Sequence, residues 1–404
     1  MEHNRPVRDR PHLLLFGWYR PGTGFTRVLQ ALLPWLAQRY RVTWMGVGYR
    51  GDPQRLAEGV RLLPTNPNGG DMMGAYAARQ SWRSLAPDIV LALNDPWYLE
   101  HYPRELLAVD PSAPLYGYMP LDGDVIDPSI LAGLRGFAGL FTYTRHAVGE
   151  LRRALAAVDL DIPVEVAGHG IDLAAFKPAA CGHGLDVRMR RAQQLFDLPE
   201  PAFVVLNASR PDPRKRIDLS LELFARAAAG LPANVFLCLH QAWSFPQFVL
   251  PLREQARNLG IADRVLWWPP QSGPIADEDL DRLYNACAVG LNTSLGEGFG
   301  LVSFEHAATG APQLLPAHPA LRELWGDAAL LLPVRPAVSD YSPLRLGQVD
   351  VDAAGLLLRH LHDDPQLYRQ KAEAALGRCL SADLRWETSA RALLRGMAPR
   401  PSLS

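Results

Sequence analysis

Short apolar runs alternate along the chain with longer segments in which apolar residues recur at the three-to-four-residue spacing of a helix. A short run that is apolar throughout is typical of a strand buried on both faces of a sheet. In the first part of the chain, strands are predicted at residues 13–18, 42–47, 88–93, 114–119, 139–144 and 164–167. Helices are predicted between strands, one ending at Arg39 and others over residues 74–85 and 145–157. Because strands separated by helices form parallel sheets, this part predicts an α/β domain.

The same alternation restarts near residue 202 and predicts a second α/β domain. Its strands are predicted at residues 202–207, 234–240, 264–268, 286–291, 313–315 and 328–332. Two helices are expected within residues 350–381, and a last helix within 383–397. Residues 179–201 predict an irregular linker with one or two basic helical turns. The expected domains are residues 1–178 and 196–383, which suits the 404-residue length because domains typically hold about 100–200 residues.

In the second domain, residues 295–310 have the composition of an anion-binding site. They follow the predicted strand at 286–291, turn through three glycines, and then become helical. The first N–H groups of a helix have no partners within it and the helix dipole favours negative charge there, so this turn can bind a phosphate. Glu297 in the turn and Glu305, expected about two helical turns in, can accept hydrogen bonds from sugar hydroxyls. The stretch indicates a sugar-phosphate site, with an ordinary strand-turn-helix as the alternative.

A second candidate anion site follows the predicted strand at 202–207. Arg210 and Lys215 stand in this polar turn before an expected helix, and both are expected to be exposed. Arginine offers a planar fork of donors and lysine a compact charge, and both suit a diphosphate. Arg214 and Arg216 lie beside them, so a solvated basic turn is the alternative.

Candidate residues of the first domain stand at the carboxyl ends of predicted strands, where ligands of parallel sheets bind. Gly22 and Gly24 form a glycine turn after the strand at 13–18, although a plain tight turn has the same pattern. Four polar residues follow two other strands and are candidates for the acceptor side: Asn94, Asp95, Asp122 and Asp124.

Three motifs together, two of them described above, resemble those of a known family. The sequence Glu-Gly-Phe-Gly-Leu at 297–301 is followed by Glu305, and the pair Arg210 and Lys215 precedes it. His-Gly-Ile-Asp at 169–172 stands at the expected domain junction. In their order along the chain, the motifs resemble those of retaining glycosyltransferases of family 4, the group 1 type.

The resemblance covers nearly the whole chain and is most specific over residues 203–332. It implies the GT-B fold, in which two Rossmann-like α/β domains face each other across a cleft. It also implies that the C-terminal helix, within residues 384–404, packs back on the first domain.

The resemblance assigns roles to the motif residues. Glu297 is implied to bind the donor sugar and Glu305 the ribose. Arg210 and Lys215 are implied to neutralise the donor diphosphate, and with Glu297 they form the expected catalytic set. The resemblance implies that Trp268 stands at the turn near which the nucleobase binds, with packing as the alternative for its side chain. The remaining donor-binding residues are implied to be the first-domain glycines and the residues of the glycine turn: Gly22, Gly24, Gly298, Phe299, Gly300 and Leu301.

No metal or other cofactor is expected, because the resemblance implies that protein groups carry the leaving-group charge. Two acidic pairs imitate an Asp-x-Asp metal motif, Asp122 with Asp124 and Asp277 with Asp279. The second pair precedes an expected helix, so Asp277 or Asp279 is expected to be its N-cap.

One departure concerns the group that stabilises positive charge on the sugar. Many members of the family have a histidine just beyond the strand at 114–119, where this chain has Pro-Leu-Asp. His101, His146 and His169 are the alternatives that the sequence leaves open.

Composition narrows the partners. The 41 basic and 42 acidic residues give a net charge of −1, which offers no electrostatic case for nucleic-acid binding. The four cysteines are far apart, as in a reduced cytosolic protein. No apolar stretch is as long as a membrane span, and the run at 13–18 is too short for a signal peptide. We therefore expect a cytoplasmic protein.

The function expected from the sequence is metal-independent transfer of a hexose-type sugar from a nucleotide diphosphate sugar, UDP-linked rather than GDP-linked. A nucleotide-sugar epimerase or hydrolase on the same scaffold and a non-catalytic sugar-nucleotide-binding subunit are the alternatives. The acceptor is expected to contact first-domain loops at 64–73 and 94–102, which carry no motif that identifies it. A peripheral membrane contact and the oligomeric state stay open.

Overall fold

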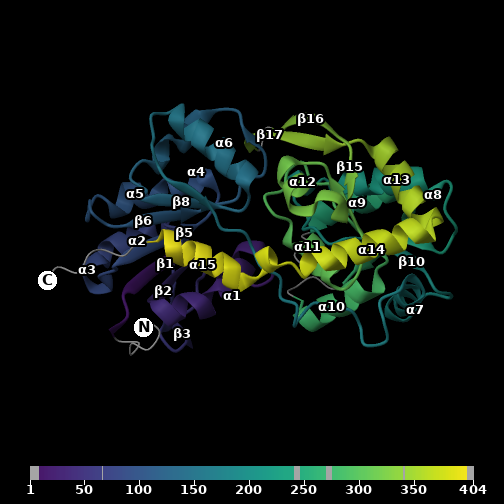
Figure 1. The fold of residues 1–404 in the computed structure, drawn as a ribbon, viewed down its shortest axis with the longest axis horizontal. Coiled ribbons are helices and arrows are strands. Elements are labelled where there is room, and N and C mark those ends of the chain that lie inside the picture. The colour runs from purple at the N-terminus through teal and green to yellow at the C-terminus, as the bar shows by residue number, and fades with distance from the viewer. Residues whose placement is uncertain (1–8, 66, 241–245, 270–274, 340–341, 398–404) are drawn as a thin grey trace. The chain divides into compact units, whose positions relative to one another are not determined.

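A computed structural model describes residues 9–65, 67–240, 246–269, 275–339 and 342–397. The chain forms two compact units, each with its own parallel sheet (Figure 1). The first unit contains residues 1–170 and 385–404, and the second contains residues 171–384.

The sheet of the first unit has the strand order β3-β4-β2-β1-β5-β6-β8-β9, and its strands are parallel except for β3. The six strands predicted from apolar runs are confirmed within a few residues: β1 (His12–Trp18), β2 (Arg41–Val47), β5 (Ile89–Leu93), β6 (Leu115–Tyr118), β8 (Gly139–Thr142) and β9 (Val164–Val166). The unpredicted strands are β3 (Gln54–Ala57) and β4 (Val60–Pro64) at one edge and the two-residue β7 (Asp124–Val125). In β4 only Val60 and Leu62 are buried, so this strand has no continuous apolar run.

The helices of the first unit include α1 (Gly24–Arg39) and α6 (Arg145–Ala156), as predicted. The helix predicted over 74–85 is divided at Ser81 into two, and the segment 94–102, expected to be a loop, contains one short helix and the start of another. These short helices are α2 (Ala75–Gln80), α3 (Trp82–Leu85), α4 (Pro96–Leu99) and α5 (His101–Leu106).

The last helix, α15 (Trp386–Gly396), belongs to the first unit and lies beside α1 (Figure 1). Its first residue, Trp386, stacks on His169 with ring centroids 5.8 Å apart. A Cβ atom on Gly170 would lie 2.2 Å from the backbone nitrogen of Trp386, so only glycine permits this approach.

The sheet of the second unit has the order β12-β11-β10-β13-β14-β15 and is parallel throughout. All six strands were predicted: β10 (Phe203–Asn207), β11 (Val235–His240), β12 (Val265–Trp268), β13 (Val289–Leu291), β14 (Gln313–Pro316) and β15 (Leu330–Leu332). β13 begins later than predicted because the preceding helix extends through Ala286.

Eight helices of the second unit are described: α7 (Leu185–Phe196), α8 (Ile217–Ala228), α9 (Pro246–Asn258), α10 (Asp277–Ala286), α11 (Leu301–Ala308), α12 (Pro319–Trp325), α13 (Val351–Asp363) and α14 (Pro365–Cys379). The 3₁₀ helices whose full bounds are described are η2 (Pro67–Gly69), η3 (Pro128–Leu134), η4 (Pro213–Lys215), η5 (Ala262–Arg264), η6 (Gly326–Ala328) and η7 (Ala382–Leu384). α8 and α13 pack on each other and contribute Leu221, Phe224 and Leu358 to a core whose sheet side includes Val205 and Leu237.

The interpretation of residues 179–201 as an irregular linker is wrong, because most of this segment is helix α7. Arg188 of α7 is almost fully buried and donates to the carbonyls of Tyr284 (2.7 Å), Cys287 (2.9 Å) and Thr309. A buried arginine with several carbonyl acceptors replaces the apolar stripe by which a packed helix is normally recognised.

An antiparallel hairpin, β16 (Val334–Ser339) and β17 (Ser342–Val349), was not predicted. Among the residues of β17 whose burial is described, Leu344, Leu346, Gly347 and Val349 are buried, and the exposed Arg345 and Gln348 interrupt them, so no continuous apolar run marks the strand. The Gly347 amide donates to the Leu295 carbonyl over 2.8 Å, which attaches the hairpin to the glycine-rich turn of the same unit.

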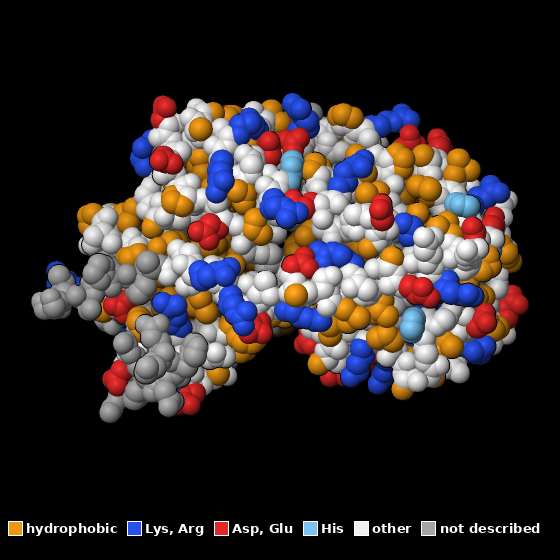
Figure 2. All heavy atoms as spheres, viewed as in Figure 1, with side chains coloured by type: hydrophobic (Ala, Val, Ile, Leu, Met, Phe, Trp, Pro, Cys, Tyr) orange, Lys and Arg blue, Asp and Glu red, His pale blue; other side chains and the backbone are white. Residues whose placement is uncertain are grey.

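On the face shown in Figure 2, basic and acidic side chains are intermingled, as expected from 41 basic and 42 acidic residues. This mixed surface offers no extended positive area there for a nucleic acid. Among the described helices, none has both the length and the apolar character that crossing a membrane requires.

Candidate active site

The candidate site of the second unit is built on two neighbouring strands. β10 and β13 pair in parallel, with Val205 opposite Val289 and Leu206 opposite Gly290. The segments that follow them therefore leave the sheet at the same edge. We call residues 208–216 the basic turn and residues 292–300 the glycine turn.

Lys215 of the basic turn forms an ion pair with Glu297 of the glycine turn, with 2.6 Å between Nζ and Oε2. Each side chain is only 13% exposed, so the pair is largely shielded from water. Burial by itself would raise the pKa of Glu297, but the nearby charges of Lys215 and Arg214 outweigh it and lower the pKa to about 2. Glu297 is thus a carboxylate at neutral pH and can accept hydrogen bonds. The expectation that Lys215 would be exposed is wrong.

Arg210 differs from Lys215 in its surroundings. Its side chain is exposed, and the guanidinium group forms no hydrogen bond or ion pair with the residues that the structure describes. Its guanidinium group can bind an incoming anion without first leaving a partner, whereas Lys215 must be shared with Glu297.

Arg214 joins the two turns in two ways. Its side chain donates to the carbonyl of Gly296, and its own carbonyl accepts from the Leu295 amide over 2.8 Å. Its Nη1 also lies 3.9 Å from Oε2 of Glu297. Arg214 could not be distinguished from a solvated basic turn by sequence alone, because Gly296, the acceptor of its side chain, lies 82 residues away along the chain.

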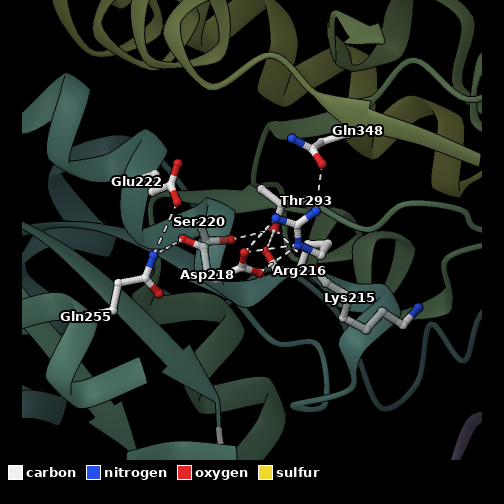
Figure 3. Close-up of polar contacts among 8 residues, drawn as sticks. All are labelled: Lys215, Arg216, Asp218, Ser220, Glu222, Gln255, Thr293 and Gln348. Carbon is white, nitrogen blue, oxygen red and sulfur yellow. Dashed lines mark hydrogen bonds and ion pairs between the residues drawn. The ribbon is translucent and has the colours of Figure 1, made fainter. Parts of the chain in front are cut away.

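A buried chain of polar side chains supports the backbone of Lys215 (Figure 3). Thr293 in the glycine turn donates to the carbonyl of Arg216 over 2.9 Å, and its hydroxyl lies 3.3 Å from the carbonyl of Lys215. Ser220 of α8 lies 2.7 Å from the same hydroxyl, and Asn207 at the end of β10 donates to Ser220 over 2.8 Å. The chain ties the carboxyl end of β10 to both turns.

Arg216 is a structural residue. Its φ of 45° places it in the left-handed region at the start of α8, where residues other than glycine are uncommon. Its guanidinium group forks onto Asp218, with 2.7 Å between Nη2 and Oδ2, and donates to Gln348 of β17 over 2.7 Å. In Figure 3 this side chain extends toward Gln348, away from the direction of Lys215. Arg216 therefore connects the basic turn with the hairpin.

The glycine turn ends at the N-terminus of α11, as predicted. Gly300 has a φ of 83° and is the N-cap, and the helix begins at Leu301. Its first-turn amides are the groups to which an anion would bind. Phe299 is 4% exposed and packs on Phe304 with ring centroids 5.1 Å apart, so its side chain belongs to the core. Phe299 can serve a ligand only through its backbone, which is the role that the resemblance implies.

Glu305 lies nearer the start of the helix than expected. It is the fifth residue of α11, about one and a half turns in rather than two. Its side chain is 5% exposed, and the hydroxyl of Tyr284 lies 3.4 Å from Oε2. Glu297 and Glu305 thus occupy different settings, one in the turn beside a lysine and one in the helix beside a tyrosine.

Trp268 stands at the carboxyl end of β12, two strands from β10 in the sheet order. It is half-buried, and its ring centroid lies 5.5 Å from that of His240 at the end of β11. Burial lowers the pKa of His240 to about 4, so this histidine is neutral at pH 7.

The first-domain candidates belong to the first unit. Gly22 has a φ of 77° in the turn before α1, and Gly24 is the first residue of that helix. Asn94 is fully buried, donates to Sδ of Met73 over 3.2 Å and accepts from the Asp95 amide over 3.0 Å, so it holds the strand end.

The remaining first-unit candidates are acidic. Asp95 is the N-cap residue of α4, although its side chain does not cap the helix. Asp122 is half-buried, and Asp124 forms an ion pair with His146 over 3.1 Å. Of the other histidines, His101 lies 2.8 Å from a nitrogen of Arg104.

His169 is buried against Trp386, and burial lowers its pKa to about 3. It is therefore neutral at pH 7. A neutral imidazole in an aromatic contact stabilises positive charge less well than a carboxylate does. Of the three histidines considered for stabilising positive charge on the sugar, His169 is thus a packing residue of the first unit.

The expectation that Asp277 or Asp279 is the N-cap of α10 is wrong, because the N-cap is Ala276. Asp277 and Asp279 lie in the first turn, where negative side chains interact favourably with the helix dipole. Asp279 also forms an ion pair with Arg282 over 3.2 Å. Within the described part of the chain, no group of three or more His, Cys, Asp or Glu side chains has the arrangement of a metal site.

Residues 190–338 match the family model for glycosyl transferases group 1. The D-inositol 3-phosphate glycosyltransferase of Salinispora tropica is 38% identical over 159 residues, which are 37% of this chain. That match spans only 31% of the relative's own length. The enzyme of the same name from Streptomyces coelicolor is 28% identical, over 88% of this chain and 84% of its own length.

Solved structures match the whole fold. The sucrose-phosphate synthase of Thermosynechococcus elongatus aligns with a TM-score of 0.74 at 18% identity, covering 96% of this chain and 98% of its own. HepE of Anabaena, in complex with UDP and glucose, aligns with a TM-score of 0.69 at 17% identity, covering 96% and 99%. Residues 190–338 thus resemble the glycosyl transferases group 1, the chain as a whole has the GT-B fold, and together these findings support a glycosyltransferase.

Proposed function

We propose that this protein is a retaining glycosyltransferase of the family 4 type that moves a hexose-type sugar from a nucleotide diphosphate sugar without a metal ion. The observation that carries the proposal is the Lys215–Glu297 pair, held beside the N-terminus of α11. The pair and the helix offer a cation suited to a phosphate, a carboxylate suited to sugar hydroxyls and the first amides of a helix, all on two adjoining turns.

In this proposal, negative charge that develops on the departing diphosphate is stabilised by Arg210, Lys215 and the first amides of α11. Such preorganised donors are commonly the largest single contribution to catalysis. Glu297 accepts from hydroxyls of the donor sugar and fixes its orientation. Glu305 accepts from the ribose, and the acceptor hydroxyl attacks from the face that the diphosphate leaves.

The proposed donor is UDP-linked rather than GDP-linked. Support comes from HepE, whose solved complexes contain UDP, UDP-glucose, or UDP with glucose. The acceptor is not assigned, but D-inositol 3-phosphate is the first compound to try because several relatives are named for it. A cytoplasmic location is proposed as well, supported by four cysteines that are all free thiols.

The direct test is to incubate the protein with a panel of UDP- and GDP-sugars, with and without D-inositol 3-phosphate and other hydroxyl acceptors. Transfer with the donor's anomeric configuration retained is the expected result. An epimerised nucleotide sugar, or free UDP with no transferred sugar, would replace the proposal by an epimerase or a hydrolase. Tight donor binding with no turnover on any acceptor would favour a non-catalytic subunit.

A further inference from the structure

The contacts of Arg214 set it apart from the other cations of the basic turn. Arg210 extends to solvent, and Arg216 is directed to Asp218 and Gln348. Arg214 instead is directed to the glycine turn, where its side chain binds the carbonyl of Gly296, the residue directly before Glu297.

The attachment is made twice, by backbone and by side chain. The amide of Leu295 donates to the carbonyl of Arg214 over 2.8 Å, and the Arg214 guanidinium binds the next carbonyl along the glycine turn. Two links to successive residues fix both the position and the direction of the chain entering Glu297. The guanidinium also lies 3.9 Å from Oε2 of Glu297, so it supports the carboxylate electrostatically.

Gly296 is buried, so its carbonyl has few other donors available. Removal of the donor to a buried carbonyl destabilises the folded protein, and we expect the backbone to shift until the carbonyl finds another partner. Loss of the Arg214 side chain therefore changes the position of Glu297, while Lys215 and Arg210 keep their own side chains for the diphosphate.

We infer that Arg214 is a positioning residue that sets the place of the Glu297 carboxylate through Gly296, and so controls how the sugar of the donor is held. This inference rests on the proposed function, since it needs Glu297 to bind the sugar. Arg214 itself acts on the carboxylate and the backbone rather than on the nucleotide.

The inference is tested with Arg214→Ala, Arg214→Lys and the control Arg226→Ala. Arg226 is an exposed arginine of α8 that pairs with Asp352 over 2.7 Å, outside both turns. For each variant, turnover and KM are measured with a UDP-sugar, and the affinity for free UDP is measured by calorimetry.

Arg214→Ala is expected to lower kcat by about tenfold or more, as for the loss of a charged hydrogen bond, while its UDP affinity stays near wild type. Arg214→Lys keeps the charge without the planar fork and is expected to recover part of the loss. Arg226→Ala is expected to behave as wild type.

A parallel loss of free UDP affinity in Arg214→Ala would overturn the inference, because Arg214 would then be a direct diphosphate ligand. Unchanged turnover in a folded Arg214→Ala would overturn it as well. Arg210→Ala and Lys215→Ala, measured beside it, separate the two levels: if these two also keep full turnover, the proposed function fails and not only the role of Arg214.

Discussion

At the residue scale, the three cations of the site differ in their contacts and in their exposure to solvent. Lys215 is shielded and shared with Glu297, Arg214 holds the glycine turn, and Arg210 is exposed to solvent. The residue types alone predicted an anion site here. The pairing of Lys215 with Glu297 was not predictable, because the two are 82 residues apart and only the parallel pairing of β10 and β13 brings them together.

Arg210→Ala and Lys215→Ala are each expected to lower turnover by roughly 100-fold, in line with the loss of one preorganised charge donor. Their stabilities are expected to differ. Lys215→Ala leaves the shielded carboxylate of Glu297 without its nearest cation, which costs about 1–3 kcal/mol of unfolding free energy, whereas Arg210→Ala removes an exposed side chain. Steady-state kinetics and urea unfolding provide both measurements. Near-normal turnover in both variants would show that the basic turn has no catalytic function.

At the element scale, the parallel strands were predictable because their apolar runs are buried on both faces of a sheet. The elements that sequence missed lack such a signal. Helix α9 has Ala256 as its only buried residue among those described, and the described buried residues of the hairpin, Leu344, Leu346, Gly347 and Val349, form no continuous apolar run. Helix α7 is anchored by the buried charge of Arg188. Yet the hairpin contacts both functional turns, through Gly347 and Gln348, so a missed element supports the predicted site.

The hydroxyl of Thr293 is expected to matter as the link between these elements. Thr293→Val keeps the shape but leaves the carbonyls of Lys215 and Arg216 without this donor, so unfolding free energy should fall by about 1–3 kcal/mol and turnover should fall with it. Thr293→Ser keeps the hydroxyl and should retain most of both. Thermal unfolding and kinetics of the two variants make the comparison. Equal stability and turnover of Thr293→Val and Thr293→Ser would show that the hydroxyl does not support Lys215.

At the scale of the whole molecule, two α/β units are joined by chain crossings after residues 170 and 384. Each unit contains its own parallel sheet, and the second contains the basic turn, the glycine turn and both glutamates. The fold class was predictable because the βα alternation runs through both halves. The roles of the first-unit candidates could not be predicted from sequence, because polar residues at strand ends can also stabilise the fold. Asn94 does so through its hydrogen bonds to Met73 and Asp95.

The proposal that protein groups alone carry the leaving-group charge predicts activity in excess chelator. Transfer should persist at an undiminished rate in EDTA, because Arg210, Lys215 and the α11 amides need no metal ion. Assays with EDTA, followed by added Mg²⁺ or Mn²⁺, provide the measurement. Loss of activity that a metal ion restores would mean that one of the two acidic pairs is a metal site after all.

The central claim is that Glu297 serves the sugar and Glu305 the nucleotide. The most direct measurement is calorimetry of free UDP with Glu297→Gln and Glu305→Gln, beside transfer assays on a panel of donor sugars. Glu305→Gln should weaken UDP by about tenfold, the loss of one charged acceptor.

Glu297→Gln should leave UDP affinity unchanged or raise it, because Lys215 is released from its partner. Its turnover should fall and its choice of sugar should relax. Loss of UDP affinity in Glu297→Gln with UDP affinity kept in Glu305→Gln would contradict the claim.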